Sequence, residues 1–264
     1  NLIINEIKDC ADDIKTDNLG NLIVFKKGKK SAKSKLMVSA HMDEVGLMVT
    51  DITSDGYLKF DEVGGIDRRV LPGKRVCVGR NGLNGVIGVK PIHLTNGDEK
   101  TAVPKMNDMY IDIGAESRED ALKYVNYGDS VNFEGDFKIN GKTVVTKALD
   151  DRFGCYVLIN LIKSEPEYGM YFTFVVQEEV GLRGARPAAF TVNPDFALVI
   201  ESTTAADVAE VDASHQVCNL SKGATVTVMD RATVYDKEMI SAAFELAEKN
   251  NIAVQYKRAV AGGN

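Results

Sequence analysis

The chain has 264 residues, which is enough for one large domain or two smaller ones. A hydrophobic fraction of 44% and a charged fraction of 27% are ordinary for a globular protein, and the net charge of −6 gives no reason to expect nucleic acid or an anionic membrane as a partner. No apolar run approaches the length of a membrane span, and the first residues lack the basic segment and apolar core of a secretory signal.

Cysteine and histidine usage limits the kinds of metal site that the chain can build. The 4 cysteines are far apart in the sequence and form no Cys-x-x-Cys pair. Without a secretory signal we expect reduced thiols and a cytoplasmic location. A thiolate metal site is therefore not expected, and because there are only 3 histidines, any metal site would depend on carboxylates.

The first part of the chain predicts short elements that lead to a histidine. Residues 1–16 have weak helical spacing, and residues 17–21 have the composition of a turn. A strand beginning at residue 36 leads into His41, which is followed two positions later by Asp43. A neutral imidazole can bind a metal ion, and a nearby carboxylate can hold the ring in one tautomer. On this spacing alone, a structural histidine is the better interpretation.

Residues 51–146 differ in character from the rest of the chain. Short extended runs alternate with Gly, Asn and Asp turns, which predicts a small β-barrel or sandwich. Only residues 117–124 have a helical pattern, with Ser117 as the N-cap and Asp120 completing a capping box. We interpret His93, which lies in this region, as a structural residue.

After residue 143 the pattern becomes α/β. A helix follows Asp150, and we assign its buried side to Phe153, Tyr156, Val157, Ile159 and Leu161. Strands are predicted at residues 171–176, 196–200, 225–229 and 252–256, and an amphipathic helix is predicted at residues 237–250.

Four positions that carry candidate ligands lie at equivalent places in the predicted fold, directly after a strand. His41, Asp150, the pair Glu178-Glu179, and Glu201 each follow an apolar strand. Ligands of open α/β sheets bind beyond the carboxyl ends of the strands, so strands of one sheet would bring these side chains to one edge. One carboxylate after a strand means little, whereas four such positions with a histidine form a pattern.

The donor set of this pattern suits a metal site. One nitrogen and several oxygens are suitable for Zn²⁺, Co²⁺ or Mn²⁺, and Asp150 is placed to bridge two ions. Two ions on a shared water would lower its pKa and polarise a substrate carbonyl, and one carboxylate must then remain free to take the proton. Adjacent acids on an extended chain point in opposite directions, so we expect Glu178 and Glu179 to divide into a base and a ligand.

The sequence resembles the M42 family of metallo-aminopeptidases over nearly its whole length. The segments that carry the resemblance are SAHMDEVGLMV, ALDDRFGCYVL, VVQEEVGLRGA and ALVIESTTAADV, supported by DNLGNLIVFKKG, VGGIDRRVLPGKRV and the closing AGGN. The family includes glutamyl aminopeptidases, tetrahedral aminopeptidases and relatives once labelled endoglucanases.

The resemblance implies a role for each candidate residue. His41 would be a ligand of one metal ion, oriented by Asp43, and Asp150 would bridge two ions. Glu178 would be the general base, Glu179 a ligand, and Glu201 a ligand of the other ion. Many relatives have Asp at the position of Glu201, so this chain has a longer side chain at that ligand position.

Other acids and histidines have weaker cases. We expect Asp151 to start the helix that follows it rather than to bind metal. Glu44 is interpreted as structural or charge-tuning, Asp207 as a loop residue, and neither His93 nor His215 lies in a context that matches a family ligand. Arg183 and Arg186 follow the Glu pair, and packing or surface solvation is a better interpretation for them than selection of acidic substrates.

Family members continue past the Gly-Gly-Asn segment to a histidine that completes the shell of the second ion, whereas this chain stops at Asn264. We expect the natural protein to continue beyond that residue. The alternative is a truncated protein that lacks this ligand and binds one ion.

The resemblance implies an α/β fold: a mixed-sheet, zinc-peptidase-like catalytic domain with helices on both faces, and an inserted small β-barrel or sandwich domain. The catalytic domain would comprise residues 1–50 and 147–264, and residues 51–146 would form a β-rich oligomerisation domain. We expect a homo-oligomer, either a dimer or a dodecamer.

The leading functional hypothesis is a dinuclear aminopeptidase that holds two divalent ions and removes N-terminal residues from short peptides. Metal-bound hydroxide would be the nucleophile and Glu178 the general base. Two alternatives stay open: an endoglucanase-type glycoside hydrolase using paired carboxylates, which the absence of Trp disfavours, and a catalytically inactive, assembly-forming relative. The sequence does not identify the preferred N-terminal residue or the native metal.

Overall fold

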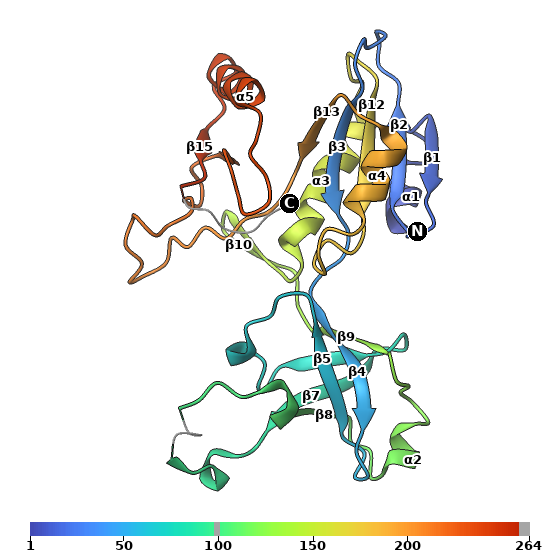
Figure 1. Ribbon diagram of the computed structural model, residues 1–264, viewed down its shortest axis with the longest axis vertical. Helices are drawn as coiled ribbons and strands as arrows, with labels where there is room; N and C mark the ends of the chain where they lie inside the picture. Colours follow the sequence, from blue (N-terminus) through green and yellow to red (C-terminus); the bar gives the residue numbers. More distant parts are fainter. Residues whose placement is uncertain (98–100, 259–264) are drawn as a thin grey trace.

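The computed structural model describes residues 1–97 and 101–258, which form an α/β body and a β-barrel (Figure 1). The α/β body is built on a five-stranded mixed sheet with the order β1-β2-β12-β3-β13. Its strands are β1 (Asp13–Thr16), β2 (Leu22–Lys26), β3 (Leu36–His41), β12 (Met170–Val175) and β13 (Phe196–Val199). β12 and β13 both run parallel to β3. The carboxyl ends of these three strands therefore lie at one edge, as the sequence predicts.

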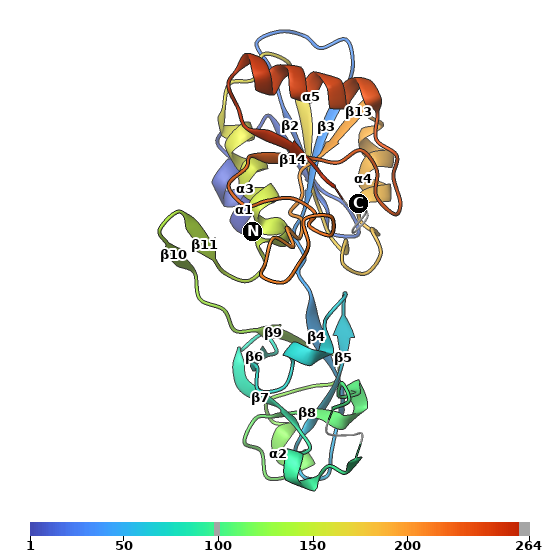
Figure 2. The ribbon, with the colours of Figure 1, turned by 90° about the vertical axis from the view of Figure 1, so that its left-hand side faces the viewer.

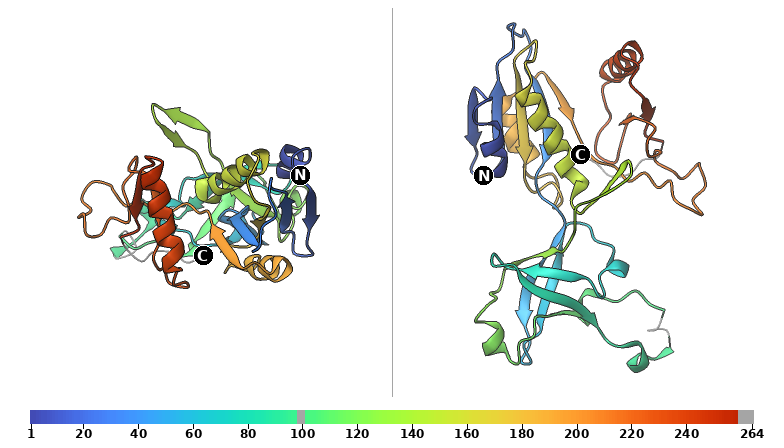
Figure 3. Two further views of the ribbon diagram at one scale, coloured as in Figure 1. Left: turned by 90° about the horizontal axis from the view of Figure 1, so that it is seen from above. Right: turned by 180° about the vertical axis from the view of Figure 1, so that it is seen from behind.

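Helices cover both faces of this sheet (Figure 3). α1 (Leu2–Ile7) and α3 (Leu149–Lys163) lie on one face and α4 (Ala185–Val192) on the other. Alternate side chains of β2 divide between the two cores: Leu22 and Val24 pack toward α1 and α3, and Ile23 packs toward α4. The weak helical pattern of residues 1–16 is wrong for its last residues: the helix ends at Ile7, and Ile14 pairs with Val24 in the β1–β2 ladder.

The buried face of α3 is offset from the predicted one. Phe153, Tyr156 and Leu161 are 52%, 63% and 38% exposed. The helix instead buries Gly154, Cys155, Leu158 and Ile162. These positions share one face of the helix, which is rotated from the face formed by Phe153, Val157 and Leu161.

Six strands close into the barrel in the order β4-β5-β8-β7-β6-β9. They are β4 (Gly46–Ile52), β5 (Leu58–Val63), β6 (Arg75–Val78), β7 (Leu83–Val89), β8 (Met109–Asp112) and β9 (Ser130–Phe133). Closure leaves no unpaired sheet edge, and the interior holds a core of its own around Leu47, Ile52 and Leu58. β4 is a barrel strand although it begins before residue 51, and the division of the chain into two domains stays a prediction.

The barrel region also contains short helices. They are the 3-10 turns Arg68–Val70, Ile92–Leu94 and Met106–Asp108 and the helix α2 (Arg118–Ala121). The predicted N-cap of α2 is confirmed, because Ser117 Oγ accepts the N–H of Asp120 at 3.2 Å.

Two further units complete the described chain. β10 (Lys138–Asn140) and β11 (Thr143–Val145) form an exposed hairpin that stands apart from the barrel (Figure 2). β14 (Ala224–Val226) and β15 (Val254–Tyr256) form a parallel pair, shorter than predicted, next to the predicted amphipathic helix α5 (Lys237–Lys249). The closing Ala-Gly-Gly-Asn segment lies outside the described residues. Within residues 1–97 and 101–258, every helix is too short or too polar to cross a membrane.

Candidate metal centre

His41 is the centre of the predicted site. It is the last residue of β3 and only 2% exposed. Its Nδ1 lies 3.0 Å from the main-chain oxygen of Asp43, so the N–H at Nδ1 donates to that oxygen. Its Nε2 faces carboxylates, at 3.0 Å from Asp150 Oδ1, 3.5 Å from Glu201 Oε1 and 3.9 Å from Glu178 Oε2. Because the N–H at Nδ1 is held by Asp43, Nε2 is the ring nitrogen that faces the acidic cluster, and it can bind a metal ion when it carries no proton.

The segment after β12 brings both glutamates of the predicted pair to His41. One ligand atom from each of His41, Glu178 and Glu179 lies within 4.8 Å of the others. The expectation that the two side chains point in opposite directions is wrong, because the chain is no longer extended: β12 ends at Val175 and Gln177 has a φ of 57°. The division of the pair into a base and a ligand stays a prediction.

Asp43 holds this glutamate segment by its main chain. Its Oδ1 accepts the N–H of Glu178 and its Oδ2 accepts the N–H of Glu179, each at 3.1 Å. The carboxylate lies farther from His41, with Oδ1 at 3.6 Å from Nδ1. The main-chain oxygen of Asp43 orients the imidazole more closely than its carboxylate does.

Asp150 and Asp151 reach the sheet edge from the start of α3. The prediction that Asp150 follows a strand of the same sheet is wrong, because β11 belongs to the separate hairpin. α3 instead packs against β3 and carries Asp150 to Nε2 of His41. The Asp150 side chain is 60% exposed, so it faces the solvent side of the cluster.

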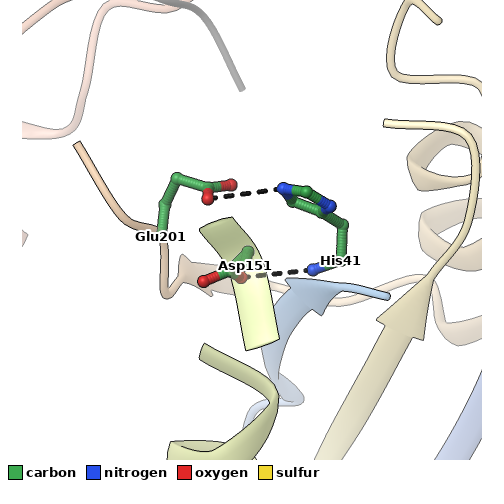
Figure 4. Close-up of side chains that lie close together, drawn as sticks. All are labelled: His41, Asp151 and Glu201. Carbon is green, nitrogen blue, oxygen red and sulfur yellow. Dashed lines mark hydrogen bonds and ion pairs between the residues drawn. The ribbon is translucent and has the colours of Figure 1, made fainter. Parts of the chain in front are cut away.

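Asp151 is completely buried and lies beside the facing side chains of His41 and Glu201 (Figure 4). Its Oδ1 accepts the N–H of Gly154 at 2.9 Å, which agrees with its predicted place at the start of the helix. Its Oδ2 accepts the N–H of His41 at 3.3 Å. One ligand atom from each of His41, Asp151 and Glu201 also lies within 4.8 Å of the others, so Asp151 has a stronger case as a ligand than its sequence context indicates.

The cluster strongly perturbs the ionisation of its members. Burial raises the pKa of Asp151 to about 7, and the charge of Glu201 adds to this rise. Burial also raises the pKa of Glu201 to about 7, and it raises the pKa of Glu178 and Glu179. Burial alone would lower the pKa of His41, but its hydrogen bonds to Asp150, Asp43 and Glu201 raise it above the usual range.

Burial is the main cause of the raised carboxyl pKa values, and the convergence of several carboxylates on a single imidazole adds to it. A divalent ion would relieve their repulsion and would meet one nitrogen and several oxygen donors. The tautomer fixed at Nδ1 supplies the nitrogen. The described residues at this sheet edge therefore fit a divalent metal ion.

Other residues considered from the sequence lie outside the cluster. His93 is exposed on the barrel and His215 is exposed in a loop. Glu44 accepts from Lys147 at 3.0 Å and from Arg152 at 2.9 Å, which supports its structural interpretation. Asp207 accepts the N–H of Leu220, as expected of a loop residue.

Comparisons with known proteins identify relatives over nearly the whole chain. Residues 20–264 match the family described as M42 glutamyl aminopeptidase. A protein of Acetivibrio thermocellus, whose name describes it as a candidate aminopeptidase, is 45% identical over 264 residues, which are 99% of this chain and 77% of the relative. The lysyl aminopeptidase of Pyrococcus furiosus is 34% identical over 261 residues, which are 96% of this chain and 73% of the relative.

The fold has close counterparts among solved structures. The TET1 peptidase of Pyrococcus horikoshii matches with a TM-score of 0.84 and 41% identity, over 100% of this chain and 78% of that one. That peptidase assembles into a tetrahedron or a large octahedral shell. The similarity thus extends over both the α/β body and the barrel.

Proposed function

We propose a mechanism for this chain, which belongs to the M42 family and is a metal-dependent aminopeptidase. The observation that carries the mechanism is the acidic cluster around Nε2 of His41 at the carboxyl edge of three parallel strands. The matching family and the relatives are peptidases, which favours this activity over glycoside hydrolysis. The substrates we propose are short peptides, from which the N-terminal residue is removed.

Two divalent ions, Zn²⁺, Co²⁺ or Mn²⁺, are the cofactors we propose. His41, Asp150, Glu179 and Glu201 would hold them. When bound, the ions supply Lewis-acid polarisation of the scissile carbonyl and make a water molecule more acidic. The oxygens of Asp151 accept the N–H groups of His41 and Gly154 and so hold the end of β3 against the start of α3, and each oxygen keeps a second lone pair that could face an ion.

Glu178 is the general base of this mechanism. Its carboxylate lies at the cluster, and burial raises its pKa, which makes it a better proton acceptor than an exposed glutamate. It takes a proton from the attacking water and returns it to the amine that leaves when the peptide bond breaks. Asp43 positions it by accepting the N–H groups of Glu178 and Glu179.

Replacing Glu178 with Gln tests this assignment. The amide keeps the size of the side chain but cannot accept the proton, so we expect kcat to fall by about 10²–10⁴-fold. Metal content, measured by mass spectrometry of the dialysed protein, should stay unchanged.

The matched control is Glu245→Gln, the same change at an exposed position of α5. This control should retain the activity of the parent protein. Near-normal turnover by Glu178→Gln would show that another group is the base.

We also propose that the chain forms a homo-oligomer, a dimer or a dodecamer, in the cytoplasm, through surfaces of the barrel and the hairpin. The assembly of the TET1 relative supports this proposal. So do exposed apolar side chains of the hairpin, because Phe137 and Ile139 are 67% and 68% exposed.

A further inference from the structure

The glutamates of the site lie on a loop with closely spaced ends. The loop leaves β12 at Val176 and enters α4 at Gly184, the N-cap of that helix. A Cβ added at Gly184 would lie 2.2 Å from the main-chain oxygen of Val176, so no side chain fits between the two ends. The two ends of residues 176–184, named the glutamate loop here, are therefore in close main-chain contact.

One side chain from a distant part of the sequence joins both ends of the glutamate loop. Asn21 is completely buried, and its Oδ1 accepts the N–H of Val176 at 2.9 Å. Its Nδ2 donates to the main-chain oxygen of Gly184, also at 2.9 Å. A single amide thus bonds the first and last residues of the loop.

Asn21 is itself held by the turn that precedes β2. Its Nδ2 also donates to Asp17 Oδ2 at 2.7 Å. The other oxygen, Asp17 Oδ1, accepts the N–H groups of Leu19, Gly20 and Asn21, each at 2.9 Å. These bonds leave the Asn21 amide one orientation, with the oxygen toward Val176 and the nitrogen toward Gly184.

The two attachments of the loop act at different points. Asn21 fixes the ends, and Asp43 fixes the main chain of Glu178 and Glu179 in the middle. If the ends separated, the carboxylates would move relative to His41 even with Asp43 in place. Displacements of about 1 Å at a catalytic group cost on the order of 100-fold in rate.

We propose that Asn21, oriented by Asp17, is a positioning residue of the aminopeptidase: it ties the ends of the glutamate loop and so sets where Glu178 and Glu179 lie relative to His41. This inference rests on the proposed roles of the two glutamates. It gives the turn at residues 17–21 a role in positioning the glutamates for the reaction.

The variant Asn21→Asp tests the tie with little change in size. The aspartate keeps an oxygen for the N–H of Val176 but places its second oxygen against Gly184 and Asp17, where the parent protein has a donor. We expect kcat to fall by about 10–100-fold while KM changes by less than about threefold. Hydrogen–deuterium exchange of the metal-loaded protein should show faster exchange of the Glu178 and Glu179 amides.

Two further variants separate positioning from general stability. Val24→Ala removes core volume from the adjacent β2, where Val24 is fully buried, without touching the loop. It should lower the melting temperature and leave loop exchange and kcat near the parent values. The swap Asp17→Asn with Asn21→Asp restores a donor–acceptor pair between positions 17 and 21 but still faces Gly184 with a carboxylate. It should therefore recover stability and leave kcat low.

Two results would overturn the proposal: loop exchange in Asn21→Asp equal to that in Val24→Ala, or full recovery of kcat by the swap. Exchange requires no turnover, so it tests the tie even if Glu178→Gln remains active and the base assignment fails.

Discussion

At the residue scale, hydrogen bonds to main-chain groups hold several side chains of the site in place. The Nδ1 of His41 donates to a main-chain oxygen, and Asp43, Asp151 and Asn21 all accept main-chain N–H groups close to the cluster. Side chains anchored in this way hold fixed positions while the cluster changes its charge. Burial of the remaining carboxylates, together with their mutual repulsion, raises their pKa values and so affects how the stability of the protein depends on pH.

We predict that the chelated protein loses stability as the pH rises from about 4 to about 7. The pKa of Asp151 rises from an ordinary value of 3.8 to about 7 on folding, and that of Glu201 rises from 4.5 to about 7. The folded state therefore binds more protons than the unfolded state in this window, so unfolding becomes easier as those protons are lost. His41 acts in the same direction above pH 6.5, because its pKa is raised as well.

Thermal unfolding with excess chelator checks this prediction. A loss of 1 kcal/mol lowers Tm by about 2–4 °C in a protein of this size. The variant Asp151→Asn cannot ionise and should show a shallower pH dependence. A Tm that rises between pH 5 and pH 7 in the chelated parent protein would contradict the ionisation described here.

At the element scale, three parallel strands place most of the site. β3, β12 and β13 deliver His41, the Glu178-Glu179 pair and Glu201 to one edge, and α3 delivers Asp150 and Asp151. β12 is flanked by β2 and β3 and packed by helices on both faces, which makes it the central element of the sheet. Removing a buried side chain of β12 should therefore destabilise the sheet edge that carries the site.

We predict that Phe174→Ala destabilises the protein by about 3–5 kcal/mol, because Phe174 is fully buried and the change leaves a cavity. The same change at Phe190, which is 88% exposed on α4, should cost within about 0.5 kcal/mol. Denaturant unfolding of the two variants measures the difference. Equal losses would mean that β12 is not the centre of the core.

The sequence predicts this arrangement well where it depends on strand ends. Apolar runs followed by His41, Glu178-Glu179 and Glu201 identify one sheet edge, and the turn-rich middle of the chain predicts the barrel. The approach of Asp150 from a helix was not predictable from local pattern, because the apolar pair Val144-Val145 before it resembles the end of a sheet strand. The tie from Asn21 to Gly184 joins residues 163 positions apart and has no local signal beyond a turn composition.

At the whole-molecule scale, the hairpin exposes apolar side chains to solvent. The hairpin pairs Ile139 with Val144 on one face, and the exposed Phe137 lies directly before β10. A two-stranded hairpin is only marginally stable alone in water, so this face is expected to pack against another copy of the chain.

We predict that Ile139→Asp lowers the mass of the assembly measured by light scattering and leaves the metal content per chain unchanged. The matched control is Lys138→Asp on the opposite face of the hairpin, which should keep the parent mass. An unchanged mass for Ile139→Asp would show that assembly uses other surfaces.

The position of the barrel in the chain also affects how the site forms. His41 and Asp150 are 109 residues apart in sequence, and the barrel lies between them, with its first and last strands paired at Leu47 and Val131. Once the barrel has closed, only the short segments on either side of that pairing separate the two site residues. Loop-closure entropy then opposes their meeting by about 1 kcal/mol less than in an unfolded chain. The barrel thus lowers the entropic barrier to assembling the proposed metal centre, to which its described residues supply none of the proposed ligands.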